Sequence, residues 1–256
     1  MPVLRVNNYV DAYRLRAQAE DVHDLAARPD KPFVTELVNR QILDAIQPSS
    51  EDFLVDIGCG DASLVRMAGA RALKCVGIAG SVEEKLRLES EFPGVSILAG
   101  QAQSLPLESR SATKIVCNGM MHYLPSEDDV KAALREMARI AIPGATIWIG
   151  EVPEINEYVH YGMYRGNSML GYLWHLLGHN GLRAFLGMIR RWIKAVFGKE
   201  RIVLNSAGMF YASPDRMRTL AKSCGLVPKA HLRSKEIDSE GKISDSKLRY
   251  DYVFTV

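Results

Sequence analysis

Short apolar runs alternate with helical stretches over roughly residues 35 to 155. The runs that predict buried strands are 53–56, 74–79, 95–99, 114–118 and 146–151. Between the last two, apolar side chains from Asp128 to Ala141 recur at the spacing of one helix face, and the Pro-Gly turn that follows ends this helix. Strands that alternate with helices in this way predict βαβ units and a parallel sheet.

The segments on either side have patterns of their own. Residues 8–46 predict helices ahead of the sheet, a polar one and then an amphipathic one. Near the C-terminus, Ser213 and Pro214 supply the cap and first-turn proline of another helix, which Gly225 ends. Alternating apolar positions then predict an antiparallel strand pair at 229–237 and 248–256.

About fifty residues between Glu154 and Leu204 fall outside these patterns. Within them, residues 182–197 repeat apolar side chains at helical spacing. The basic residues between them are Arg183, Arg190, Arg191 and Lys194. Such a helix is typical of peripheral membrane contact or of binding to an acidic ligand. The favoured interpretation is instead a lid helix whose apolar side packs on the domain while its arginines stay solvated. A third interpretation is a lid whose arginines bind a phosphate group of the substrate.

Composition and net charge limit which partners and which cellular location we expect. The formal net charge of +2 implies no polyanion partner by itself, so we expect no nucleic acid. The four cysteines show no Cys-x-x-Cys pairing, which favours small core residues over redox or metal roles. The N-terminus lacks a signal profile, and no run of about 18 apolar residues occurs. We expect a cytoplasmic protein, peripheral at the inner face of the membrane if helix 182–197 makes membrane contact.

A glycine loop follows the first strand, in the stretch from Phe53 to Ser63. Gly58 and Gly60 flank Cys59, and a helix begins just beyond them. Such a turn brings bare backbone close to a ligand at a helix N-terminus. The dinucleotide fingerprint requires a third glycine where this chain has Ser63, whereas an acid stands two residues before Gly58, at Asp56.

Asp56 and the glycine loop resemble motif I of the class I S-adenosylmethionine-dependent methyltransferases. Later cues in the chain follow the order of that family. They are Gly100-Gln-Ala, Leu105-Pro-Leu, a strand leading into Met121-His-Tyr-Leu, and Pro143-Gly. The resemblance implies an α/β fold with a Rossmann-like, doubly wound, seven-stranded sheet that is parallel except for an antiparallel last strand. It also implies S-adenosyl-L-methionine as cofactor.

The expected organisation has four parts. Residues 1–46 form an N-terminal helical cap, and residues 47–154 form the cofactor-binding core. Residues 155–204 form a helical lid insertion that selects the substrate. Residues 205–256 complete the core sheet.

The resemblance also implies where the cofactor binds. Asp56, Gly58, Cys59 and Gly60 would face its methionine half. The other predicted cofactor-binding residues follow the later strands: Ala79, Gly80, Ser81, Gln101, Ala102, Asn118 and Gly119. Ala79 stands where the family has the acid that takes the ribose hydroxyls, and a methyl group accepts no hydrogen bond. Ser81, Glu83 or Glu84 would therefore have to substitute, or the ribose contact is weaker.

Methyl transfer mainly requires that donor and acceptor are held within attack distance. A hydroxyl acceptor also needs a base, whereas a neutral amine does not. The predicted catalytic residues are His122 and Glu151, which follow the fourth strand and end the fifth. Weaker candidates are Tyr123, His160, His175 and His179. No cluster has metal-ligand spacing, so no metal is predicted.

The C-terminal half resembles methyltransferases of surface-polysaccharide gene clusters, through Arg165-Gly-Asn, Arg183-Ala-Phe-Leu-Gly and Arg249-Tyr-Asp-Tyr. This likeness implies a small-molecule or sugar acceptor, methylated at oxygen, with a phosphate-bearing or lipid-linked acceptor as one form. Two alternatives stay open. A non-catalytic binding module is favoured by Ala79, Gln101 and Thr113, and a nicotinamide-dependent oxidoreductase would use a similar sheet.

Overall fold

The computed structural model describes residues 3–6, 9–18, 21–26, 32–70, 74–156, 168–198, 202–205, 210–237 and 241–256. A seven-stranded sheet has the order β4-β3-β2-β5-β6-β9-β8, in which only β9 runs antiparallel to its neighbours. Its strands are β2 (Phe53–Ile57), β3 (Lys74–Ala79), β4 (Ile97–Ala99), β5 (Ala112–Asn118), β6 (Ala141–Pro153), β8 (Val227–Ile237) and β9 (Ile243–Thr255). The predicted Rossmann-like α/β architecture is confirmed.

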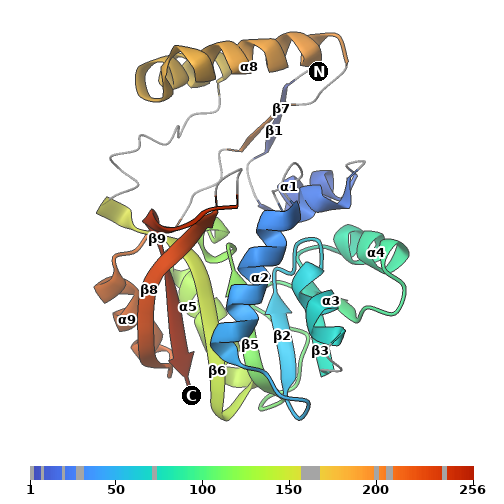
Figure 1. Ribbon diagram of the computed structural model, residues 1–256, viewed down its shortest axis with the longest axis vertical. Helices are drawn as coiled ribbons and strands as arrows, with labels where there is room; N and C mark the ends of the chain where they lie inside the picture. Colours follow the sequence, from blue (N-terminus) through green and yellow to red (C-terminus); the bar gives the residue numbers. More distant parts are fainter. Residues whose placement is uncertain are drawn as a thin grey trace.

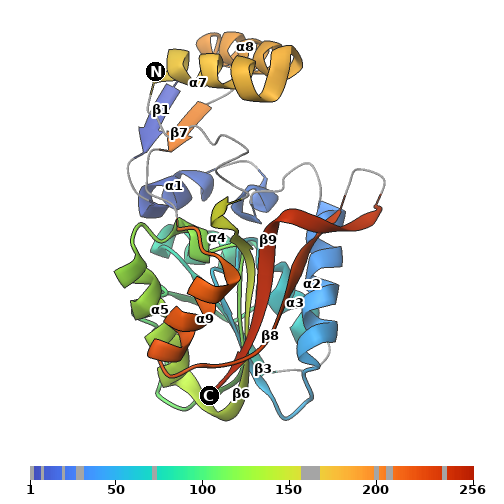
Figure 2. The ribbon, with the colours of Figure 1, turned by 90° about the vertical axis from the view of Figure 1, so that its left-hand side faces the viewer.

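Helices cover both faces of this sheet (Figures 1 and 2). One face carries α5 (Glu127–Ile140) and α9 (Pro214–Ser223), and the other carries α2 (Pro32–Ile46) and α3 (Ser63–Gly69). The sequence explains why α5 forms: Ser126 caps its N-terminus, and its apolar side chains recur at helical spacing and are buried. The same holds for α9, which begins with the predicted Ser213 cap and Pro214 and is followed by Gly225 in a left-handed conformation.

Three short elements lie at the edge of the sheet where the parallel strands end. They are α1 (Tyr9–Arg16), the 3-10 turn η1 (Val22–Ala26) and η2 (Met121–Tyr123). Beside them, α4 (Val82–Glu91) packs with η1 and with β3. Because parallel strands all end at this edge, the side chains that follow β2, β3, β4 and β5 meet there.

Some predicted bounds were wrong. The Pro143-Gly144 turn was expected to precede the fifth strand, but β6 begins at Ala141, which pairs with Ala112 of β5. The pairing partner lies about thirty residues earlier in the sequence, so local pattern does not show it. A two-stranded parallel sheet was also missed, in which β1 (Val3–Val6) pairs with β7 (Ile202–Asn205).

The insertion contains a helical hairpin of α7 (Met169–His175), the π-helical turn η3 (Leu176–Asn180) and α8 (Gly181–Val196). The predicted helix at 182–197 therefore exists. The hairpin stands away from the main sheet, beyond β1 and β7 (Figures 1 and 2). Of the helices in the described parts of the chain, none combines the length and apolar character needed to cross a bilayer.

Candidate functional site

The glycine loop follows the buried strand β2 and turns over the end of β3. Ile78 accepts hydrogen bonds from the backbone N–H groups of Gly58 and Cys59, at 2.9 and 3.2 Å. Gly58 has a φ of +73°, and a Cβ placed there would lie 2.8 Å from Met120 Cγ. Only glycine fits this position, because the conformation disfavours side chains and the space is already filled. The loop is a cradle of bare backbone.

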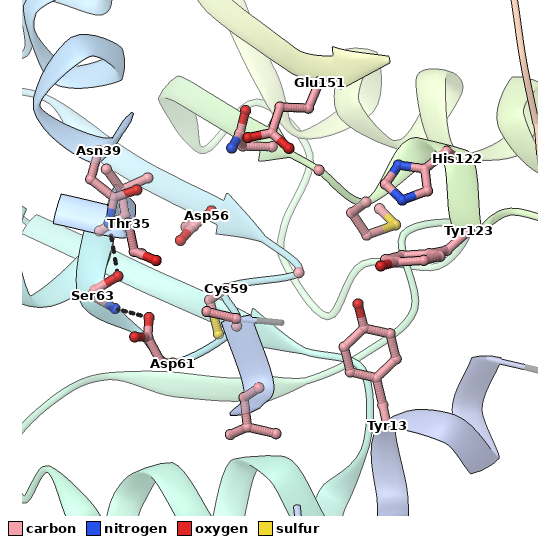
Figure 3. Close-up of a pocket in the computed structure, with 18 of the residues that line it drawn as sticks. Tyr13, Thr35, Asn39, Asp56, Cys59, Asp61, Ser63, His122, Tyr123 and Glu151 are labelled. Atoms are coloured by element: carbon pink, nitrogen blue, oxygen red, sulfur yellow. Dashed lines mark hydrogen bonds between the residues drawn. The ribbon is translucent and has the colours of Figure 1, made fainter. Parts of the chain in front are cut away.

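Two adjoining cavities share the residues of this loop. Figure 3 shows the first of them. The first has a volume of about 250 Å³ and the second of about 80 Å³. The residues that line both are Tyr13, Gly58, Cys59, Gly60, Met120 and Tyr123. Tyr13 of α1 meets Tyr123 edge-on, with ring centroids 5.8 Å apart. These two rings therefore border both cavities beside the loop.

Asp56 ends β2 and lines the first cavity, with its side chain buried. Burial, together with the charge of nearby Asp61, raises the pKa of Asp56 to about 7. A cation beside this carboxyl would favour its ionised form. The site thus contains an acid whose environment is suited to a positively charged group.

Asp61 lies on the same loop and was not predicted as a site residue. His23 Nδ1 of η1 is 2.7 Å from one of its carboxylate oxygens, and the Ser63 N–H donates to the other at 3.1 Å. Asn39 of α2 in turn donates to the Ser63 hydroxyl at 2.8 Å (Figure 3). These bonds tie the loop to η1 and α2, which belong to the predicted cap.

The second cavity lies between the ends of β3 and β4. Its lining includes four of the residues predicted to bind the cofactor, Ala79, Gly80, Gln101 and Ala102. The Gln101 amide donates to the Gly80 carbonyl at 2.5 Å, which joins the two strand ends. The second cavity is thus lined by apolar side chains, among them Ile78 and Ala79, together with the amide of Gln101.

The structure separates the three candidates for the acid missing at position 79. Ser81 caps α4 by accepting from the Glu84 N–H, and it lines neither cavity, unlike the other residues predicted to bind the cofactor. Glu83 is exposed and pairs with Arg14 at 3.5 Å. Glu84 is buried and lines the second cavity, and a Cβ on Gly80 would lie 3.2 Å from its Oε2. A carboxylate from α4 therefore stands near the place where the family has one on β3.

Both predicted catalytic residues line the first cavity. His122 is buried, and its ring lies 4.0 Å from that of Tyr123. Glu151 comes from a bulge in β6, faces Gly119, and pairs with Arg249 Nη1 at 2.7 Å. Asn118 lines the cavity between them. Figure 3 shows Glu151 and His122 on the same side of the loop as Asp56.

The backbone of Glu151 has a φ of +56°, which is rare outside glycine and costs energy. Its N–H donates to Asp251 of β9 at 2.8 Å, and Ser234 of β8 donates to the same oxygen at 2.6 Å. Burial raises the pKa of Asp251, although these two hydrogen bonds oppose the rise. Strands β8 and β9 thus hold Glu151 in a strained position that directs its carboxylate into the cavity.

A family model described as a methyltransferase domain matches residues 55–149. This range contains the glycine loop and the ends of β2, β3, β4 and β5. Residues 55–149 are thus similar to a methyltransferase domain, in agreement with the resemblance of the glycine loop to motif I. S-Adenosylmethionine is the cofactor of this domain, and the glycine cradle and the acid at Asp56 fit its methionine group.

Similar proteins support the same domain. A methyltransferase-like protein of Schizosaccharomyces pombe is 26% identical over 136 residues, which are 52% of this chain and 50% of that protein. The chain therefore spans about half the length of this curated relative. The N-methyltransferase NodS of Bradyrhizobium japonicum, solved with S-adenosylhomocysteine, is 12% identical, with a TM-score of 0.58 over 97% of this chain and 98% of its own.

A methyltransferase of Methanosarcina mazei is 15% identical, with a TM-score of 0.54 over 84% of this chain and 96% of its own. At these identities the structural likenesses show the fold alone.

The remaining candidates lie elsewhere. His175 ends α7 in the hairpin and lines neither cavity. His160 and the His179 side chain lie outside the described residues. In the described part of the methyltransferase domain and its extensions, no group of three or more His, Cys, Asp or Glu side chains could hold a metal ion.

Sequence reasoning missed several residues that border the first cavity. These are Tyr13, Leu25, Ala26, Thr35, Asn39, Asp61 and Arg249. Only Asp61 had a local signal, because it adjoins the glycine loop in sequence. The others come from the cap and from β9, and only the fold brings them to the domain's active edge.

Proposed function

We propose that the protein transfers a methyl group from S-adenosylmethionine to a hydroxyl oxygen of a small-molecule or sugar acceptor. The observation that carries this proposal is the pair of adjoining cavities that share the glycine loop. A donor held across the loop would have its adenosine in the second cavity and its methyl group at the first.

The donor would be held by residues at the ends of β2 and β4 and by one residue of α4. Asp56 would attract its ammonium group, and Glu84 would accept from its ribose hydroxyls. Gln101 and Ala102 would border the adenine. When bound, S-adenosylmethionine supplies an electrophilic methyl group on a sulfonium. Because the protein needs only to hold the partners in line, most of its contribution is positioning.

The first cavity supports a small polar acceptor. Its volume of about 250 Å³ is near the lower end of ligand sites. Hydroxyl, amide, carboxylate and imidazole groups line it, contributed by Thr35, Asn39, Asp61, His122 and Glu151. Such groups suit a hydroxyl-rich molecule better than an apolar one. Arg249 adds a cation at its border, which would favour an acceptor that bears phosphate or carboxylate.

A hydroxyl acceptor must lose its proton during transfer. Of the two predicted bases, Glu151 is ion-paired with Arg249 at 2.7 Å, and this pairing engages one of its carboxylate oxygens. His122 lies buried beside the same cavity. We therefore assign the proton transfer to His122 and acceptor positioning to the Glu151–Arg249 pair.

The proposal is tested by methyl transfer to a panel of sugars, nucleotide-linked sugars and small phenols, with mass spectrometry and NMR to locate the methyl group. We expect a methyl ether, and we expect His122→Gln to lower kcat by about 10²- to 10⁴-fold with donor binding retained. His175→Gln, in the hairpin, is the matched control and should leave kcat unchanged.

Three other outcomes would count against parts of this proposal. Methylation of nitrogen would refute the oxygen assignment. Full activity of His122→Gln would remove its role as base. Donor binding with no transfer to any class of acceptor would favour the non-catalytic module.

A further inference from the structure

The helical hairpin of residues 168–198 has a small core of its own. Ala195 of α8 is buried among Met169, Tyr172, Met188 and Trp192, which come from both helices. Figures 1 and 2 show the hairpin beyond the β1–β7 pair, on the side of the molecule toward which the carboxyl ends of the parallel strands point. It is therefore a separate element on the same side of the molecule as the active edge.

The outer side of α8 is apolar. Leu182, Leu186, Ile193 and Phe197 follow each other at intervals of four, seven and four residues, which places them along one ridge. Their exposed fractions are 61%, 51%, 50% and 74%. On α7, Leu170 and Trp174 are one turn apart and are also largely exposed. The favoured interpretation from the sequence, that the apolar side of 182–197 packs on the domain, is therefore wrong.

Basic side chains flank this ridge. Arg183, Arg190 and Lys194 are exposed and lie next to it at helical spacing. The segment 168–198 contains no aspartate or glutamate. An exposed apolar ridge beside a row of basic residues fits a helix lying in the plane of an anionic lipid surface.

We propose that the hairpin docks on an anionic membrane surface, with the α8 ridge entering the acyl boundary and the basic row contacting lipid phosphates. Charge distinguishes this partner from a second copy of the chain, because two copies of one basic face repel each other. Docking would turn the carboxyl edge of the sheet toward the bilayer, which would bring the methyltransferase site near acceptors held there.

Vesicle flotation tests the proposal with the full chain. We expect binding to vesicles of equimolar phosphatidylglycerol and phosphatidylcholine, and much weaker binding to phosphatidylcholine alone. Each basic residue near an anionic surface strengthens binding by roughly fivefold, so R183Q/R190Q/K194Q should weaken it on the order of a hundredfold. Leu186→Glu with Ile193→Glu should abolish it, because charges would have to enter the apolar layer.

Matched controls separate the hairpin from bulk charge and general exposure. Val82→Glu with Leu86→Glu changes an equally exposed pair on α4, at 58% and 59%. Lys222→Gln with Lys229→Gln removes positive charges from the exposed surface near α9 and β8. Both controls should bind anionic vesicles like the wild type. Equal loss in the controls and in the hairpin variants would overturn the proposal.

Tryptophan fluorescence gives an independent readout. Trp174 is 72% exposed, whereas Trp148 is buried at 4%. Insertion should blue-shift the emission of the wild type, and Trp174→Phe should reduce that shift. A concentration-dependent dimer that forms without lipid, with no flotation on anionic vesicles, would show that the ridge is covered by a second copy and would refute the membrane surface.

Discussion

Asp56 carries the electrostatic character of the site at the scale of single residues. It is buried at the end of β2, beside the charge of Asp61, and its pKa rises to about 7. The unfolded chain gives up this proton near the ordinary value of 3.8. Burying this acid thus weakens the unliganded fold at neutral pH, while the negative charge suits the ammonium group of the donor.

The sign of the pH dependence follows from this shift. Because the pKa is higher in the folded state, the stabilising effect of the protonated form is complete below about pH 3.8 and is lost as the pH rises through about 7. Removing the Asp56 charge should prevent this loss of folding stability at higher pH. Relative to wild type, Asp56→Asn should gain about 4 kcal/mol of unfolding free energy between pH 4 and pH 8.

Urea unfolding of the ligand-free proteins across this pH range measures the difference. Asp44→Asn, at an exposed position on α2, is the control and should show a constant difference. A constant difference for Asp56→Asn as well would show that the carboxyl is not held in the proposed environment.

The sequence predicted Asp56 and the glycines because their signal is local: an acid, a turn and two glycines within a few residues. It did not predict Arg249 beside Glu151, since these residues are about a hundred positions apart and only the pairing of β6 with β9 joins them. Likewise, the positive φ of Glu151 depends on a bulge that no local pattern shows.

At the scale of elements, α4 supplies what the end of β3 lacks. Ala79 brings no acceptor to the second cavity, but Glu84 in the first turn of α4 brings a carboxylate. Ser81 and Glu84 stand at the capping-box spacing, in which glutamine serves as well as glutamate. Replacing Glu84 by glutamine therefore removes the charge and preserves the cap.

Glu84→Gln should weaken S-adenosylmethionine binding by about tenfold, because a hydrogen bond to a charged group contributes roughly 1.5–3 kcal/mol. Adding Ala79→Asp to this variant should restore much of the affinity by placing an acid on β3. Calorimetric titration measures both effects. Glu83→Gln, the exposed neighbour, is the control, and equal affinities of the Glu83 and Glu84 variants would contradict the assignment.

The predicted helices and strands were most accurate where the apolar residues of the element itself recur at helical or strand spacing. The strands β2, β3 and β5 and the helices α5, α8 and α9 follow apolar spacing and capping residues. The pairing of β1 with β7 could not be predicted, because the two segments are short and lie almost 200 residues apart. Its register depends on tertiary contact alone.

At the scale of the whole molecule, three parts meet around the carboxyl edge of the sheet. The core supplies the glycine loop, α1 and η1 border it through Tyr13 and Ala26, and β9 supplies Arg249. The hairpin lies beyond the same edge (Figure 1). This arrangement would leave the donor covered on one side and the acceptor cavity near the surface that we propose for lipid docking.

Calorimetric titration with S-adenosylmethionine and with NAD tests the central claim most directly. We predict saturable binding of S-adenosylmethionine by the wild type and none of NAD. Gly58→Val should abolish that binding, since its Cβ would meet Met120 at 2.8 Å, whereas Gly94→Val should retain it because Gly94 shares the positive φ and has open space around it. Binding of NAD with no binding of S-adenosylmethionine would contradict the account.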